Sequence, residues 1–247
     1  IDQVIFGNVL QAGNGQNVAR QISINSGIPV NVPAMTINEV CGSGMKAVIL
    51  ARQLIQLGEA NLVIAGGTES MTRAPLLQLY EEKTATYQEP IASMVNDGLT
   101  DAFSHAHMGL TAEKVATKFS VTRQEQDQYA LDSQKKAARA SESGVFKEEI
   151  IPIFLPDETV LEKDEAIREN STLEKLGTLK TVFSEAGTVT AGNASPLNDG
   201  ASVLILASKE YAIENNLPYL ATIKGVAEIG IDPSIMGIAP ITAIQTL

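Results

Sequence analysis

The sequence has very few of the side chains that form disulfides or bind zinc. Cys41 is the only cysteine among 247 residues, and His105 and His107 are the only histidines. A single cysteine cannot form an internal disulfide, which is consistent with a reducing, cytoplasmic location. One cysteine and two histidines without a zinc-type spacing also make a zinc site unexpected. We therefore expect a cytoplasmic protein that holds no metal.

Long apolar runs are also missing. No stretch approaches the ~18 consecutive apolar residues of a membrane-spanning helix, and the first segment, IDQVIFGNVL, lacks the basic and apolar regions of a signal peptide. The formal net charge of −11 argues against nonspecific binding to nucleic acid. Apolar residues still make up 44% of the chain, enough for a core in one large domain or two ordinary ones. The composition predicts a soluble protein that binds neither membranes nor nucleic acid.

Both ends of the sequence resemble interrupted elements. The chain begins at Ile1 in a strand-like segment and finishes with APITAIQTL, where Pro240 is typical of a first helical turn. No glycine or asparagine cap follows that turn. We expect the chain to be a fragment of a longer protein.

The N-terminal part has the pattern of an α/β core. Residues 33–38 indicate a short strand, and residues 41–57 indicate a helix with so few polar positions that it should be largely buried. Residues 61–67, NLVIAGG, form a continuous apolar run of the kind found in buried parallel strands. This order of elements predicts a strand–helix–strand unit.

The middle of the chain changes character twice. Residues 74–107 show no sustained period, and two helical segments follow from Gly109 onward. Thr122 and Glu125 predict a capping box at the start of the second helix, and Gly144 marks its end. The elements expected after this point are an edge strand at 148–155 interrupted by Pro152, a helix ending at Leu179 and capped by Ser171 and Glu174, a loop at 187–202, a buried strand at 202–208 and a further strand at 221–231.

These elements predict four successive parts of the fold. They are an N-terminal core at 1–72, an inserted helical domain at 73–196, a return to the core at 197–220 and the start of a second half at 221–247. An insertion of this length is usually a lid or a binding subdomain.

Cys41 allows two interpretations. A lone free cysteine is most often a small buried hydrophobic residue. However, Cys41 lies at the predicted start of a helix, where unpaired N–H groups and the helix dipole favour a thiolate. The three residues after it, Gly42, Ser43 and Gly44, are small enough to let a bulky thioester approach. A strand that ends just before a nucleophile at a helix start is also found in other α/β enzymes.

Four separated motifs resemble the thiolase family, and more narrowly the acetyl-CoA acetyltransferases. They are NEVCGSGMKA, LVIAGGTESMTRAP, DGLTDAF followed by HMGLTAE, and GTVTAGNASPLNDGAS, and they occur in the family's order over essentially the whole chain. The CGSG and GTVTAGNAS pair is similar to thiolases rather than to ketoacyl synthases. The resemblance implies a layered α/β fold, with helices around a mixed, mostly parallel sheet, a large helical loop domain, and a second half that is mostly missing.

The resemblance also implies a reaction. Cys41 would be the nucleophile that accepts an acetyl group, and a second acetyl-CoA would attack the acyl-cysteine to give acetoacetyl-CoA and coenzyme A. The coenzyme A thioester is the substrate, so no separate cofactor is implied, and a homodimer or homotetramer is expected. The residues that the resemblance places around coenzyme A are Leu99, His107, Met108, Arg168, Leu179, Phe183, Ala191, Ala194, Ser195, Leu197 and Met236.

Some of these positions also make sense from their chemistry alone. Coenzyme A is highly anionic, and Arg168, with Lys175 and Lys180 nearby, could supply local positive charge in a chain of net charge −11. Without the resemblance, the same cluster would be interpreted as a solvated helix face.

The sequence departs from the family in its base residues. The family's histidine, second cysteine and oxyanion-hole asparagine occur in motifs similar to GHPIG, CIGGGMG and NEAFA, none of which is present. We expect these 247 residues alone to be inactive in condensation. Two alternatives remain open: a degradative 3-ketoacyl-CoA thiolase of broader chain length, and a non-catalytic module that binds coenzyme A.

Overall fold

The computed structural model describes all 247 residues, which divide into two compact units. The first unit comprises residues 1–107, 197–230 and 240–247, and the second comprises residues 108–196 and 231–239. The sequence placed the start of the insertion at residue 73, whereas residues 73–107 group with the first unit. No helix is long and apolar enough to cross a membrane.

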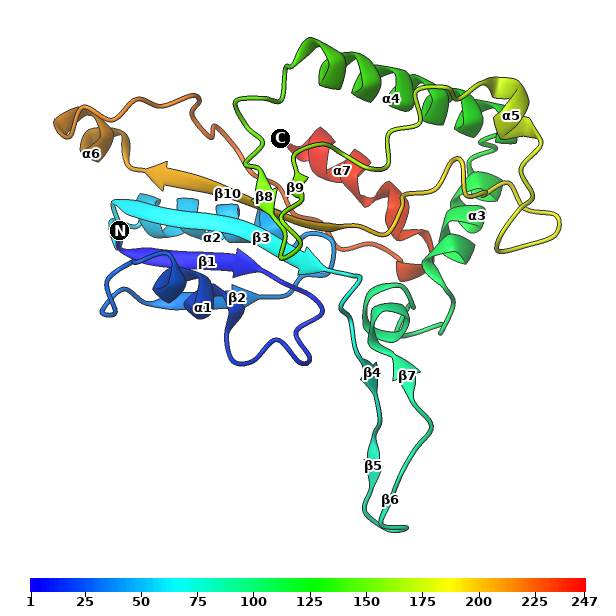
Figure 1. Cartoon of the computed structure of the whole chain (residues 1–247), viewed down its shortest axis with the longest axis horizontal. Helices are drawn as coiled ribbons and strands as arrows, with labels where there is room; N and C mark the ends of the chain where they lie inside the picture. The colour runs from blue at the N-terminus through cyan, green and yellow to red at the C-terminus, as the bar shows by residue number, and fades with distance from the viewer. The chain divides into compact units, whose positions relative to one another are not determined.

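A four-stranded sheet is the centre of the first unit (Figure 1). Its strands are β1 (Gln3–Gly7), β2 (Ala34–Ile37), β3 (Leu62–Ser70) and β10 (Asp199–Ala207), in the order β10-β3-β1-β2. β1 is parallel to both β2 and β3, and β10 is antiparallel to β3. The fold is therefore an α/β arrangement with a mixed, mostly parallel sheet, as the sequence predicted.

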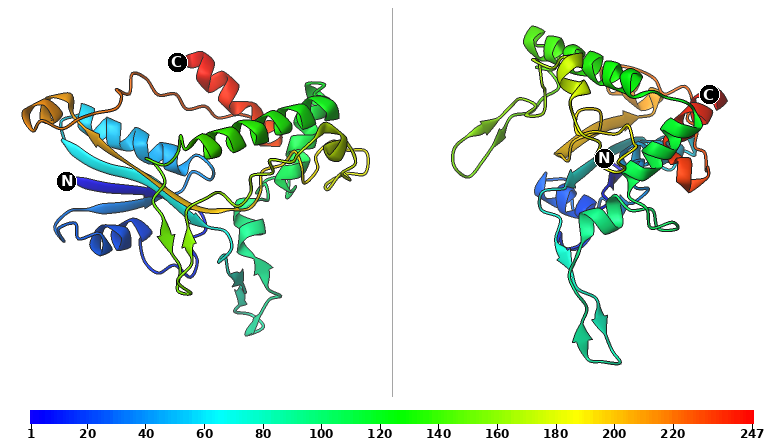
Figure 2. Two further views of the ribbon diagram at one scale, coloured as in Figure 1. Left: turned by 45° about the horizontal axis from the view of Figure 1, so that its top comes forward. Right: turned by 90° about the vertical axis from the view of Figure 1, so that its right-hand side faces the viewer.

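Helices cover both faces of this sheet. Alternate residues of β1 point to opposite sides, so the strand contributes apolar side chains to both faces. Ile5 packs with Ala47 and Ala51 of α2 (Ser43–Gln56), while Val4 and Phe6 pack on the side of α1 (Val18–Asn25). Figure 2 shows α2 and α1 on opposite faces. The two successive strand–helix–strand units confirm the pattern expected for the N-terminal part.

Residues 74–107 contain more regular structure than their sequence indicated. A narrow hairpin is formed by β4 (Leu76–Leu77) with β7 (Ile91–Ala92) and by β5 (Tyr80–Glu81) with β6 (Thr86–Tyr87). Tyr80 and Tyr87 face each other across it, with ring centroids 5.3 Å apart. A π-helix, η1 (Met94–Gly98), follows directly.

The second unit is mainly helical. It contains α3 (Met108–Lys118), α4 (Arg123–Ser143), the two-stranded pair β8 (Ile153–Phe154) and β9 (Val160–Leu161), α5 (Leu173–Gly177) and the 3₁₀ helix η2 (Pro233–Ile238). The Thr122–Glu125 capping box is present, and Gly144 ends α4 in the left-handed conformation, so both predictions are confirmed. The remaining helices of the chain are α6 (Lys209–Glu214) and α7 (Ala239–Thr246).

Several expected elements are wrong in extent. The strand expected at 148–155 is reduced to Ile153–Phe154, and residues 221–231 form no strand. Thr172, not Ser171, caps α5, because its hydroxyl accepts the N–H of Lys175.

Two expectations of burial are also wrong. β10 is an edge strand paired only with β3, and Ile205 is 69% exposed. Helix α2 buries one face only, and Met45 on its other face is 73% exposed. The apolar residues of these segments predicted a strand and a helix, but they could not predict that one face of each would be left uncovered by other elements.

Candidate functional site

Cys41 lies in the short turn between β2 and α2. Ile37 is the last residue of β2, Gly42 is the N-cap of α2, and the helix begins at Ser43, two residues later than expected. The thiol is exposed, so the interpretation of Cys41 as a buried hydrophobic residue is wrong. Cys41 directly precedes the N-cap, so the residue lies at the N-terminal end of α2, which is the positive end of the helix dipole.

The residue before Cys41 has an unusual backbone. Val40 has φ 48°, in the left-handed region that β-branched residues rarely adopt. The side chain of Ser43 holds this turn, because its hydroxyl donates to the carbonyl of Val40 at 2.6 Å and accepts the N–H of Glu39 at 2.8 Å. Ser43 is itself buried, so the constraint is shielded from water.

The start of α2 lies directly against the ends of two strands. A Cβ on Gly7, at the end of β1, would be 2.4 Å from the backbone carbonyl carbon of Ser43. A Cβ on Gly67 of β3 would be 3.3 Å from the Cα of Gly44. At Gly7 only glycine permits this backbone-to-backbone approach, and at Gly67 a Cβ would be tightly packed, so the approach fixes the start of α2 relative to the sheet.

A cavity of ≈ 460 Å³ opens at Cys41. Its walls come from the ends of β1 and β3, the start of α2, the residues after η1 and the start of β10. Apolar side chains predominate, among them Leu10, Met71 and Leu99. Leu99 directly follows the π-helix, a rare element that is frequent at functional sites. Of the expected substrate residues, Leu99 is the one that shares this cavity with Cys41.

Glu69 organises the wall after β1, and the sequence did not identify it. Its carboxylate accepts hydrogen bonds from the side-chain amide of Asn8 and from the N–H groups of Val9 and Leu10, at 2.9–3.0 Å. Asn8 is buried, and its Oδ1 has no hydrogen-bond partner. An acidic residue at the carboxyl end of a parallel strand could have been recognised, but its partners lie about sixty residues earlier in the chain.

Asp199 joins the start of β10 to the segment after β3. Its carboxylate accepts the hydroxyl of Thr72 at 2.5 Å, the N–H of Thr72 at 3.0 Å and the hydroxyl of Ser70 at 3.1 Å. These bonds, that of the Thr72 hydroxyl first, lower the pKa of Asp199 below its ordinary value of 3.8. The neighbouring residues Met71 and Gly200 line the cavity, so Asp199 stabilises one of its edges.

A second cavity, of ≈ 640 Å³, lies within the second unit. Its walls are α4, residues 166–171, α5 with Leu179, and residues 191–196. The structure brings together here four of the expected residues: Arg168, Leu179, Ala191 and Ala194.

The charge of this cavity comes from three side chains. Arg168 and Lys175 are cationic and Glu169 is anionic, and neither cation forms an ion pair. The backbone N–H of Arg168 donates to Oε1 of Gln134 at 2.7 Å, which fixes that segment on α4. The wall therefore carries two positive charges that form no ion pair and one negative charge, which leaves a net charge of +1.

The other six expected residues line neither of these two cavities. Ser195 and Leu197 are in or next to the 191–196 segment, and Phe183 packs over Gly109. His107 forms an isolated β-bridge with Thr100, Met108 begins α3, and Met236 is on η2. Because η2 packs against α3, Met236 contributes to the second unit.

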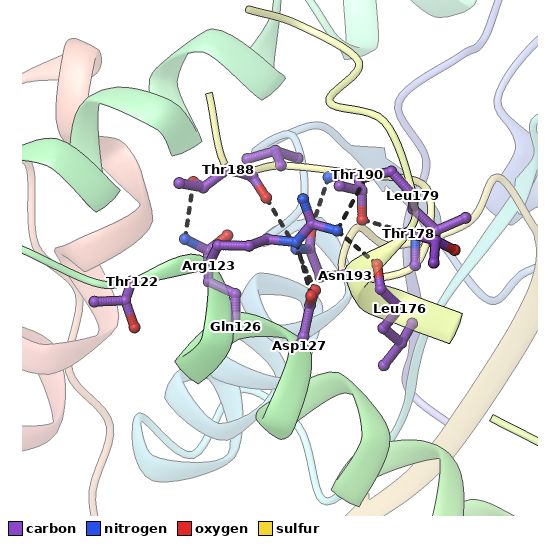
Figure 3. Close-up of polar contacts among 12 residues, drawn as sticks. Thr122, Arg123, Gln126, Asp127, Leu176, Thr178, Leu179, Thr188, Thr190 and Asn193 are labelled. Atoms are coloured by element: carbon purple, nitrogen blue, oxygen red, sulfur yellow. Dashed lines mark hydrogen bonds and ion pairs between the residues drawn. The ribbon is translucent and has the colours of Figure 1, made fainter. Parts of the chain in front are cut away.

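A network of polar side chains connects α4 to segments that line the second cavity (Figure 3). Arg123 on α4 pairs with the nearly buried Asp127, which also accepts the amide of Asn193. On α3, Glu113 accepts the N–H groups of Thr188 and Val189. Sequence reasoning missed this network, because the contacts that join α3 and α4 to the later segments span 53–76 residues, although Arg123 and Asp127 are only four residues apart.

No group of three or more histidine, cysteine, aspartate or glutamate side chains is arranged to hold a metal ion.

Comparison with known proteins places this geometry in context. A family profile described as "Thiolase, N-terminal domain" matches residues 1–210. A probable acetyl-CoA acyltransferase of Staphylococcus aureus (strain COL) is 48% identical over 252 residues, covering 99% of this chain and 64% of that protein.

Two solved structures are similar over the whole chain. The Bacillus anthracis acetyl-CoA acetyltransferase has a TM-score of 0.94 and 40% identity, and the Acat5 thiolase from Ascaris suum in complex with coenzyme A has a TM-score of 0.93 and 40% identity. Each match covers 100% of this chain and 64% of the other. The chain thus spans 64% of the length of the proteins it resembles here.

Proposed function

Since the chain belongs to the thiolase family, we propose that the protein transfers acyl groups between coenzyme A thioesters through Cys41. One observation carries the proposal: an exposed thiol on a constrained turn at a helix start, opening into a mostly apolar cavity. A thiolate is the form of cysteine that attacks a thioester.

In the first step of the proposed reaction, the Cys41 thiolate attacks the carbonyl carbon of the thioester. A new carbon–sulfur bond forms to Cys41, the carbon–sulfur bond to coenzyme A breaks, and coenzyme A leaves as a thiolate that takes up a proton. In the second step the α-carbanion of another acetyl-CoA attacks the acyl carbon. Acetoacetyl-CoA forms, and the bonding electrons return to Cys41 as its thiolate.

The second cavity is proposed to hold the long arm of coenzyme A. Arg168 and Lys175 would face its phosphates, and the small side chains of Ala191 and Ala194 would let the pantetheine pass close to the backbone. The positive charge here is notable in a chain of net charge −11, and it supports an anionic ligand.

General bases are required for the condensation step, because an α-proton must be removed. Neither cavity contains a histidine, and the chain has no second cysteine. We therefore propose that these 247 residues accept an acetyl group on Cys41 but do not condense two acetyl-CoA molecules by themselves.

The test is the reaction of the chain with acetyl-CoA, followed by intact mass measurement and peptide mapping. Acetylation at Cys41, its loss in Cys41→Ala, and protection of the thiol from later alkylation by iodoacetamide are the expected results. A native thiol that is inert to acetyl-CoA while coenzyme A still binds would favour a non-catalytic binding module instead.

The apolar cavity also supports a second candidate function, the transfer of acyl groups longer than acetyl. A volume of ≈ 460 Å³ exceeds what an acetyl group occupies, and Leu10, Met71 and Leu99 would suit a longer acyl chain. A series of acyl-CoA thioesters from acetyl to octanoyl separates the two: the acetyl-specific function predicts falling acylation with length, whereas a broad ketoacyl-CoA thiolase predicts a flat or rising series.

A further inference from the structure

We infer that Arg123, Asp127 and Asn193 form a positioning clamp that holds two walls of the second cavity together and so sets its affinity for the thioester's long arm. The inference rests on the proposed function, because that function supplies the ligand. None of the three residues lines the cavity, so they act through the backbone segments that do.

The first half of the clamp holds the wall formed by α5. The Arg123 guanidinium donates to the carbonyl of Leu176 at 2.6 Å and to that of Leu179 at 3.1 Å. Both leucines line the cavity. The last carbonyls of a helix lack partners within the helix, and a charged donor satisfies them more strongly than a neutral one. Arg123 therefore fixes the end of α5 and the turn after it.

The second half holds the opposite wall, residues 191–194. Asn193 donates to Asp127 at 3.0 Å and to the carbonyl of Thr188 at 3.0 Å, and its Oδ1 accepts the N–H of Thr190 at 2.8 Å. The side-chain amide thus makes three hydrogen bonds, and the neighbours of Asn193 in this segment, Ala191, Gly192 and Ala194, line the cavity.

Asp127 joins the two halves. Its Oδ2 accepts Nε of Arg123 at 2.7 Å and its Oδ1 accepts Asn193, while the residue is only 3% exposed (Figure 3). Burial makes such a carboxylate costly unless both oxygens are satisfied, as they are here. Because Asp127 neutralises Arg123, the pair adds no net charge to the ligand site, and its effect is geometric.

The loop that carries Asn193 is also anchored at its start. Gln126 donates to the hydroxyl of Thr188 at 2.9 Å, and Glu113 accepts the N–H of Thr188 at 2.8 Å and that of Val189 at 2.8 Å. With both ends tethered, movement of Asn193 is transmitted to Ala191 and Ala194 rather than being absorbed by the loop.

Two variants test the clamp in the intact protein. Arg123→Lys keeps a cation beside Asp127, but its single ammonium cannot replace both Nε, which donates to Asp127, and Nη2, which donates to the two carbonyls. Asp127→Asn replaces one accepting carboxylate oxygen with an NH₂ group. That NH₂ group would face a donor of either Arg123 or Asn193, so one of the two hydrogen bonds is lost. For both variants we expect the Kd for coenzyme A, measured by calorimetry, to rise about tenfold.

The readout that separates positioning from general damage is a pair of substrates. We expect the acetyl-CoA concentration that gives half-maximal acetylation of Cys41 to rise about tenfold at a nearly constant maximal acetylation rate, while acetylation of Cys41 by the short thioester S-acetyl-N-acetylcysteamine, which lacks the nucleotide, stays within twofold of wild type. Gln128→Ala is the matched control, since Gln128 bonds only the exposed Asp132 on the same helix, and it should change neither value.

A double-mutant cycle then tests the coupling of the two walls. If one clamp holds both, Arg123→Lys and Asn193→Ala should be strongly non-additive in the Kd for coenzyme A. Additive effects, an unchanged Kd, or an equal loss with both thioesters would overturn the inference. Failure of the wild-type protein to bind coenzyme A would instead remove the proposed ligand and the proposed function together.

Discussion

The two cavities are built in different ways. At Cys41 the walls are strand ends and a helix start, and backbone meets backbone at Gly7 and Gly67. In the second cavity the walls are mostly irregular segments, tethered by side chains from α3 and α4. Regular elements hold a reacting atom more accurately than loops do, whereas loops adapt more readily to a long ligand. The comparison teaches that reactive geometry and ligand affinity depend here on different kinds of contact.

Gly7→Ala should have the largest effect on the backbone-built cavity. The new Cβ would meet the backbone of Ser43 at 2.4 Å, so β1 and α2 would have to separate. We expect the free energy of unfolding, measured by urea denaturation, to fall by about 3 kcal/mol. Gly230→Ala is the control, because a Cβ there would contact nothing within 4 Å. Equal stability of the two variants would show that the close approach is not a constraint.

Ser43→Ala should have an intermediate effect that is specific to the turn. It removes the two hydrogen bonds that hold Val40 in the left-handed conformation, at a cost of about 1–2 kcal/mol. We also expect acetylation of Cys41, followed by mass spectrometry, to slow several-fold. Ser143→Ala removes an exposed serine hydroxyl near the end of α4, which also donates to a backbone carbonyl, and should leave the rate unchanged. Wild-type acetylation in Ser43→Ala would contradict a role for the constrained turn.

Asp199→Asn should have the smallest effect, and the effect should depend on pH. The pKa of Asp199 is lowered in the folded protein, so its carboxylate stabilises the fold above its ordinary pKa of 3.8. This contribution is lost as the pH falls through the lower, folded pKa. The stability difference between wild type and Asp199→Asn, from urea unfolding between pH 2 and pH 7, should be largest near neutrality and shrink below about pH 4. A difference that stays constant over this range would argue against the Thr72 and Ser70 hydrogen bonds.

Local patterns predicted much of the first unit, and the ends of α4 in the second unit, from sequence. The order of β2, α2 and β3 and the capping of α4 depend on neighbours a few residues apart, so the sequence determines them directly. The position of Cys41 between a strand and a helix was predicted for the same reason, although the helix begins two residues later.

The features that could not be predicted depend on distant partners. The exposure of β10 depends on which layer covers it, and its own apolar residues carry no such information. The Asp127–Asn193 contact joins residues 66 positions apart through one buried carboxylate. The expected substrate residues were identified by the resemblance to a known family. The spacing of the residues alone would not have placed Arg168 and Ala191 in the same cavity.

The antiparallel pairing of β10 with β3 has a consequence for synthesis of the chain. β3 ends at Ser70, but its partner starts at Asp199, 129 residues later. At a ribosomal rate of about 5–20 residues per second, the nascent β3 edge waits on the order of ten seconds before its partner emerges. During that interval an apolar strand edge is open to pairing with other chains. Chaperone demand and co-translational aggregation of this protein should therefore depend on how quickly the intervening segment is translated.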